Sequence, residues 1–197
     1  MNATSSTMET LLQARYGKNT ASEYKLNPTL ETLLEHRSVR RYEDKELAPN
    51  TLELLVAAAQ SASTSSNLQS WSVVAIEDPE RKDRLARIAG NQEHIRACPL
   101  FLVWLVDLAR LEALGARRGV ARDSLDYLEL LMVGIIDATL AAQNAAVAAE
   151  SLGLGIVYIG GMRNQPEAVA AELALPPRTF GVFGMCIGHP SPEQVAA

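Results

Sequence analysis

The sequence is poor in cysteine, in aromatic residues and in net charge. Its 197 residues include two cysteines, Cys98 and Cys186, and only 5% are aromatic. Cysteines so far apart form neither a C-x-x-C pair nor a zinc-ligand spacing, which argues against a disulfide scaffold and predicts two buried thiols. A formal net charge of −5 argues against nucleic-acid binding, because the chain has no surplus of cations to neutralise phosphates.

Long uninterrupted apolar runs are also missing. No N-terminal stretch joins basic residues to an apolar core, so we expect no secretory signal. The longest apolar region, residues 125–149, contains Asp126, Glu129 and Asp137, which make a membrane span costly. With 48% hydrophobic residues, the chain is too apolar for a disordered protein and large enough for its own core. We expect a soluble, cytoplasmic protein.

Several catalytic motifs are absent. The sequence contains no G-x-S-x-G, H-E-x-x-H or Walker loop. Its histidines, His36, His94 and His189, are too scattered to indicate a metal site, and we expect His94 and His189 to be structural. Residues 153–158 imitate the dinucleotide fingerprint G-x-G-x-x-G, but Tyr158 takes the last glycine position and a helix precedes the motif instead of a strand. We therefore expect no Rossmann site there.

Helix and strand signals alternate after an opening pair of helices. Residues 100–106 are nearly all apolar, which is typical of a strand covered on both faces. The order predicts an α+β or α/β domain with one sheet. We expect helices at residues 10–16, 28–37, 49–61, 78–89, 123–152 and 165–173, and strands at residues 71–76, 100–106, 156–159 and 180–187.

Residues 123–152 are the most distinctive predicted element. About 28 residues would form a helix roughly 42 Å long, with apolar or small side chains on nearly every side. A helix of that kind must be buried on every side. We expect one stretch to pack on the sheet and another on a second subunit. The alternative is the central helix of a monomer.

Three polar or glycine-rich clusters are candidates for binding. Residues 36–42, HRSVRRY, fit an anion site, because arginine forks match phosphate oxygens; the alternative is a basic helix C-terminus, favoured by the helix dipole. The polar residues 63–69 form a second cluster, for which ordinary loop chemistry is the alternative. Gly160 and Gly161, at a predicted strand end, would let a flat ligand approach the backbone and expose an N–H.

Taken together, five segments resemble the FMN-dependent nitroreductase and flavin reductase family, and in particular its NADPH-dependent, oxygen-insensitive branch. They are HRSVRRY at 36–42, SSNLQ at 65–69, GNQEH at 90–94, AAESLGLGIVYIGGMRN at 148–164 and FGMCIGHP at 183–190. The resemblance implies a homodimer with an α+β, nitroreductase-like fold, in which helices flank a central mixed or antiparallel sheet and a long central helix lies at the dimer interface. It implies an N-terminal extension at 1–27, an FMN-binding domain at 28–190 and a short tail at 191–197.

The resemblance also implies which residues contact FMN, in a groove lined by both subunits. It implies no catalytic acid, base or nucleophile, since the protein needs only to place the flavin N5 and stabilise negative charge on the reduced ring. The implied contacts are His36, Arg37 and Ser38 at the phosphate; Arg40 at the ribityl and pyrimidine end; Thr64, Ser65 and Ser66, partly from the opposite subunit; Gln69 and Gln92 at the ribityl chain or ring; Tyr158, Ile159, Gly160 and Gly161 along the isoalloxazine; and Arg163, without a defined role.

The implied activity is hydride transfer from NADPH through FMN to nitroaromatic, quinone or flavin acceptors in a ping-pong order. No nucleic acid, membrane or metal partner is expected. Members of this branch continue beyond the equivalent of Pro190 with a Lys-Pro-Arg segment and an arm at the NADPH site, which residues 191–197 do not match. The alternative is therefore a flavin-binding carrier or sensor without efficient turnover. A related flavoenzyme, such as a reductive dehalogenase, stays open.

Overall fold

The structure is a computed structural model that describes residues 7–17, 25–121 and 123–195. Residues 1–6 and 18–24 of the expected N-terminal extension lie outside the described residues. The chain divides into two compact units, Met1–Arg37 and Ser38–Ala197.

The first unit contains α1 (Met8–Tyr16) and α2 (Pro28–Glu35), close to the expected ranges. Asn27 caps α2, because its side-chain oxygen accepts from the Leu30 N–H at 3.0 Å. The guanidinium of Arg15 in α1 donates to the carbonyls of Leu34 and His36 at 3.2 and 2.9 Å. These bonds join the end of α1 to the end of α2.

The second unit is built on a four-stranded sheet of order β1-β2-β4-β3. Every neighbouring pair is antiparallel, and a register shift interrupts the β2–β4 ladder between Trp104 and Leu105. Of the expected mixed or antiparallel sheet, the structure has the antiparallel form. The strands are β1 (Trp71–Ile76), β2 (Leu100–Asp107), β3 (Gly155–Ile159) and β4 (Thr179–Gly188).

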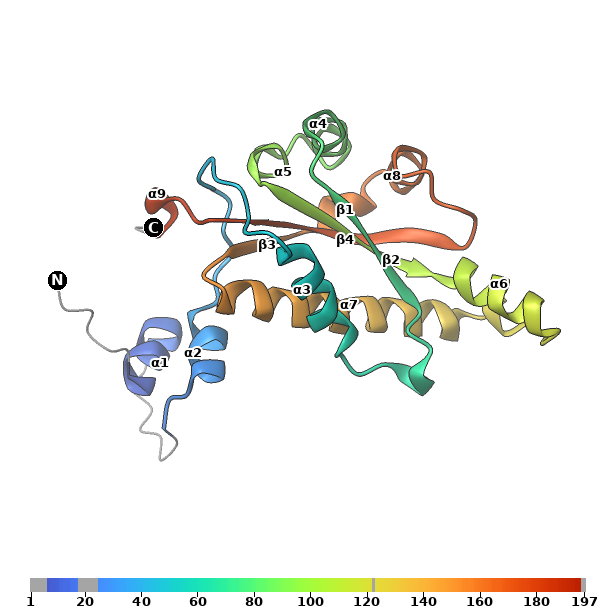
Figure 1. The fold of residues 1–197 in the computed structure, drawn as a ribbon, viewed down its shortest axis with the longest axis horizontal. Helices are drawn as coiled ribbons and strands as arrows, with labels where there is room; N and C mark the ends of the chain where they lie inside the picture. Colours follow the sequence, from blue (N-terminus) through green and yellow to red (C-terminus); the bar gives the residue numbers. More distant parts are fainter. Residues whose placement is uncertain (1–6, 18–24, 122, 196–197) are drawn as a thin grey trace. The chain divides into compact units, whose positions relative to one another are not determined.

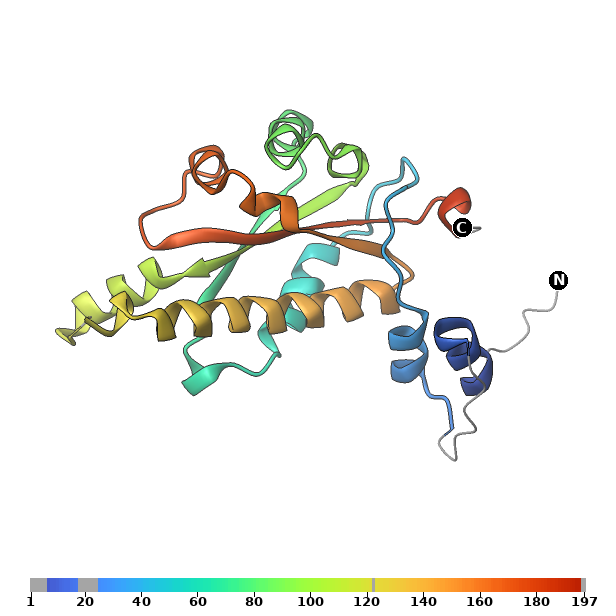
Figure 2. The same cartoon turned by 180° about the vertical axis from the view of Figure 1, so that it is seen from behind.

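Helices cover both faces of this sheet (Figures 1 and 2). Strand β2 alternates between two cores: Phe101, Val103 and Leu105 join the core on one face, whereas Leu102 and Trp104 join the core on the other. This confirms that residues 100–106 form a strand covered on both faces. The first face carries α4 (Pro79–Ile88), α5 (Glu93–Ala97) and α8 (Pro166–Glu172), and the second carries α3 (Thr51–Gln60) and α7 (Leu128–Ser151).

Three α-helices of the structure were not expected: α5, α6 (Leu108–Arg118) and the four-residue α9 (Pro192–Val195). The signals for α6 are present: the Asp107 side chain accepts from the Arg110 N–H at 3.0 Å, and Gly119 closes the helix in the left-handed conformation. Only Leu108 of α6 is buried. The remaining elements are η1 (Ser65–Asn67), η2 (Asp123–Asp126) and η3 (Gly160–Arg163).

The long helix is shorter than expected and is not buried on every side of the single chain. It has 24 residues, because Tyr127 is extended (ψ 146°) and separates it from η2. Its small residues face the sheet, but Leu128, Met132, Ile136 and Leu140 are 42–68% exposed. Among the described residues, α7 is the one helix long and apolar enough to cross a membrane, yet its small-residue face packs on the protein core.

Candidate functional site

The first part of the candidate site is the segment beside β3. Ser38 forms a parallel bridge with Ile156, and the Val39 N–H donates to the Ile156 carbonyl at 2.8 Å. The close approach requires Gly155, since a Cβ there would lie 2.6 Å from a Val39 methyl. Ser38 and Arg40 are thereby held at the edge of the sheet. Burial raises the pKa of Tyr42, whose hydroxyl donates to the Val39 carbonyl at 2.6 Å and closes the segment.

His36 and Arg37 directly precede this segment in the sequence but belong to the first unit. His36 ends α2 as its C-cap. The Arg37 Nε donates to the Glu35 carbonyl at 3.3 Å.

The second part is the turn that follows β3. A Cβ added to Gly161 would lie 2.5 Å from the Ala89 carbonyl oxygen and 2.8 Å from Nε2 of Gln92. The glycine therefore allows the turn to contact the end of α4 and the side chain of Gln92. The structure thus brings together Gln92 and Gly161, two of the sequence-predicted residues.

A cation borders the same turn. The Arg163 guanidinium crosses Gly160, at which an added Cβ would lie 3.2 Å from Nη2. Its Nη1 donates to the Val182 carbonyl at 2.5 Å. Arg163 is exposed, so its charge is held beside the glycine pair and faces solvent.

His94, which we expected to be structural, lies beside this group. Its Nε2 lies 2.8 Å from Oε1 of Gln92. Partial burial lowers the pKa of His94, and the positive charge of Arg40 lowers it further. Arg40, Gln92 and His94 therefore lie in one electrostatic neighbourhood. The signal that could have found His94 was its place in the GNQEH segment, two positions after Gln92.

The two strand residues before the glycines point to opposite faces. The Tyr158 ring packs edge-on against Phe183, with centroids 5.1 Å apart, and its hydroxyl donates to Oε1 of Gln143 in α7 at 3.3 Å. Burial raises the pKa of Tyr158. Ile159 is fully buried in the opposite core. Only the backbone of Ile159 is thus available to a ligand.

The third part of the candidate site is the loop 64–70, which contacts α7. Ser66, Asn67 and Gln69 all have positive φ, between 48° and 54°. The Thr64 hydroxyl accepts from the Gln69 N–H at 2.9 Å and donates to Asp137 of α7 at 2.7 Å. Both its hydrogen-bonding roles are thus used inside the protein, whereas Ser65 and Ser66 are exposed on the loop and Gln69 is half-buried.

Sequence reasoning treated Asp137 only as an interruption of an apolar run. In the structure its carboxylate is 1% exposed and accepts three hydrogen bonds from the loop. A buried acid in an apolar helix requires such donors, so the signal was available. The two cysteines are free and buried, as predicted.

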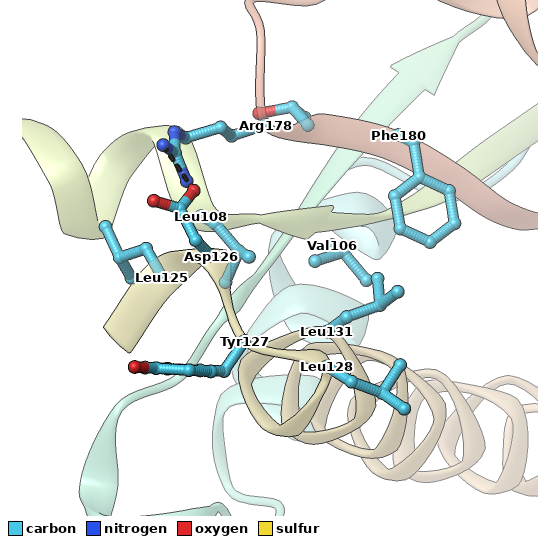
Figure 3. Close-up of a pocket in the computed structure, with 10 residues that line it drawn as sticks. Val106, Leu108, Leu125, Asp126, Tyr127, Leu128, Leu131, Arg178 and Phe180 are labelled. Atoms are coloured by element: carbon cyan, nitrogen blue, oxygen red, sulfur yellow. Dashed lines mark ion pairs between the residues drawn. The ribbon is translucent and has the colours of Figure 1, made fainter. Parts of the chain in front are cut away.

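A separate cavity of about 570 Å³ opens where α7 begins, between the nearby ends of β2 and β4 (Figure 3). Leucine and aromatic side chains line it, together with Arg178, which pairs with Asp126 at 2.7 Å. None of the sequence-predicted cofactor residues is among its lining residues. We therefore separate this cavity from the candidate site.

Comparison with known proteins decides the family. The family model described as "Nitroreductase family" matches residues 33–189. This chain belongs to the nitroreductase family. The family resemblance inferred from the sequence is thereby confirmed.

Two curated relatives and one solved structure show how close this nitroreductase chain is to known members. It is 43% identical over 167 residues to "FMN reductase (NADPH)" of Bacillus subtilis (strain 168). The aligned region covers 84% of this chain and 67% of the relative. It is 39% identical over 168 residues to "Oxygen-insensitive NADPH nitroreductase" of Salmonella typhimurium, with coverage of 84% and 67%. The structure of NfrA1 nitroreductase from B. subtilis superposes with a TM-score of 0.81 at 43% identity, covering 83% of this chain and 66% of that one. The chain thus spans about two thirds of the length of these relatives.

Proposed function

We propose that this protein is an FMN-dependent oxidoreductase that uses NADPH to reduce nitroaromatic, quinone or flavin acceptors. The observation that carries the proposal is the 43% identity to a protein named FMN reductase (NADPH) over 84% of the chain. The set of polar and glycine residues at the end of β3 also supports the proposal, because residues from distant segments that match the family lie together there.

The residues in this group fit FMN by their chemistry. Ser38 and Arg40 offer a hydroxyl and a guanidinium, which suit phosphate and ribityl oxygens, with His36 and Arg37 next to them in the sequence. Gly160 and Gly161 present a backbone without side chains, which suits the flat isoalloxazine. We place the loop residues Ser65, Ser66 and Gln69 against the same cofactor, with Thr64 supporting them from inside the loop.

The chemistry that FMN supplies when bound is hydride acceptance from NADPH and reduction of the acceptor, in a ping-pong order. The protein's own part is binding and electrostatics. Arg163, with its guanidinium over Gly160, supplies positive charge near the glycine pair, where it would stabilise a negatively charged reduced ring. Gln92, held by Ala89 and His94, orients an amide toward the same turn.

We propose further that the protein is a homodimer assembled through α7. The exposed side chains of Leu128, Met132, Ile136 and Leu140 recur every four residues and form one apolar stripe. An apolar stripe of this length on a single chain is typical of an interaction surface. We also propose a cytoplasmic location, which agrees with two free thiols.

An absorbance experiment on the purified full chain tests the proposed function. We expect a flavin spectrum after incubation with FMN and gel filtration, and bleaching of that spectrum when NADPH is added under argon. Air or a nitroaromatic acceptor should restore the colour. A protein that retains no FMN contradicts the proposal, and a yellow protein that NADPH does not bleach indicates a flavin carrier instead.

A further inference from the structure

The loop 64–70 has an unusual backbone conformation, and one buried side chain bonds both of its ends. Its residues Ser66, Asn67 and Gln69 have φ values of 51°, 54° and 48°, a region that costs free energy for residues other than glycine. Such a conformation persists only where contacts with the surrounding structure stabilise it. The main contacts come from Asp137, near the middle of α7.

Asp137 accepts hydrogen bonds from both ends of this loop. Its Oδ2 accepts from the Thr64 hydroxyl at 2.7 Å and from the Ser70 N–H at 3.0 Å, and its Oδ1 accepts from the Ser65 N–H at 3.2 Å. All three partners are donors, so the carboxylate acts only as an acceptor. Hydrogen bonds to a buried carboxylate are stronger than neutral ones.

The packing of α7 explains how the carboxylate reaches the loop. Gly134 lies one turn before Asp137, and a Cβ there would be 2.6 Å from a Val106 methyl and 3.3 Å from the Ser70 carbonyl oxygen. The missing side chain lets the helix approach Ser70 closely. The Ser70 carbonyl in turn accepts from the Asp107 N–H at 3.0 Å, so the loop end is fixed between α7 and β2.

We infer that Asp137 is a positioning residue that sets the backbone of loop 64–70 and thereby its contacts with the flavin. This inference rests on the proposed function, in which Ser65, Ser66 and Gln69 line FMN. Asp137 itself is 1% exposed and therefore acts through the loop. Because Ile136 beside it is exposed on the proposed dimer stripe, the same turn of α7 carries both the loop anchor and a subunit contact.

Asp137→Asn tests the inference in the full chain. The asparagine can keep the two bonds at one oxygen, but its amide nitrogen would face the Ser65 N–H, donor against donor. We expect the FMN affinity to weaken about tenfold or more, as for one lost hydrogen bond to a charged group. Quenching of flavin fluorescence measures this affinity. The visible circular dichroism of the bound flavin should change as well.

Ala141→Gly is the matched control. Ala141 is fully buried one turn further along α7 and does not contact the loop by hydrogen bonds, so its replacement lowers helix stability. We expect that variant to keep its FMN affinity within about twofold, because the Ala141 methyl group has no donor or acceptor for the loop, and to keep the flavin dichroism of the wild type. A purely structural role of Asp137 would make the two variants alike and would overturn the inference.

Thr64→Val and Thr64→Ser probe the same contact from the loop, should Asp137→Asn fail to fold. Valine removes the hydroxyl donor and serine keeps it, so we expect weaker FMN binding with valine and rescue with serine. Equal affinity of the two variants overturns the inference. A wild-type chain that binds no FMN contradicts the proposed function instead, so the two failures are distinguishable.

Discussion

The imidazole Nε2 of His94 lies 2.8 Å from Oε1 of Gln92. The Gln92 amide nitrogen donates to the Ala89 carbonyl at 2.9 Å, so its oxygen faces His94 as an acceptor and the histidine is the donor. Burial, and then the charge of Arg40, lower the pKa of His94 below its ordinary 6.5, while Glu93 opposes the shift. His94 therefore orients Gln92 as a neutral ring at neutral pH.

This relationship predicts a pH dependence of stability. Since the pKa of His94 is lower in the folded state, the unfolded chain takes up the proton first as the pH falls. The contribution of neutral His94 to the stability of the fold is fully present above pH 6.5. It is lost as the pH falls through the lower, folded-state pKa. We expect the thermal midpoint of the wild type to fall more steeply below pH 6.5 than that of His94→Gln, which keeps a donor. Parallel curves would show that His94 contributes nothing.

The packing of Gly161 predicts a difference between two neighbouring glycines. In Gly161→Ala the new Cβ meets the Ala89 backbone oxygen at 2.5 Å, whereas in Gly160→Ala it meets the movable end of Arg163 at 3.2 Å. We expect Gly161→Ala to lose about 1–3 kcal/mol of unfolding free energy, as for overpacking, and Gly160→Ala to lose clearly less. Urea titrations of both variants measure this, and equal losses would speak against the close contact.

The proposed phosphate contact predicts a specific loss of affinity in Arg37→Ala. Removing a hydrogen bond to a charged group costs about 1.5–3 kcal/mol, which titration calorimetry with FMN would detect. Arg41→Ala is the control, because Arg41 already pairs with Glu193 at 2.8 Å and both side chains are exposed; we expect a change below about 1 kcal/mol. Unchanged affinity in Arg37→Ala refutes the assignment.

The exposed stripe of α7 predicts the effect of a charge at Ile136. This side chain is 52% exposed in the single chain, so Ile136→Glu should leave the fold intact but be costly inside a subunit interface. We expect a folded monomer by sedimentation and circular dichroism. Leu114→Glu on α6, at an equally apolar exposed site, should remain dimeric. A dimeric Ile136→Glu protein would place the interface elsewhere.

Local signals in the sequence predicted most helix and strand positions. Asn27 before Pro28 and Asp78 before Pro79 mark helix starts that the structure reproduces, because a cap acts through its immediate neighbours. The apolar run of β2 predicted burial on both faces. Helix α6 escaped notice since it buries little, and the start of α7 was misplaced because a local break at Tyr127 has no strong compositional signal.

The sequence by itself determined the family, the order of elements and the residue types available for a flavin site. Only the tertiary structure decided which of them meet. Asp137 and Ser70 are 67 positions apart, and no local propensity encodes their 3.0 Å hydrogen bond. Likewise, the neutral state of His94 depends on burial and on Arg40. Both are properties of packing between distant segments, which composition and spacing do not specify.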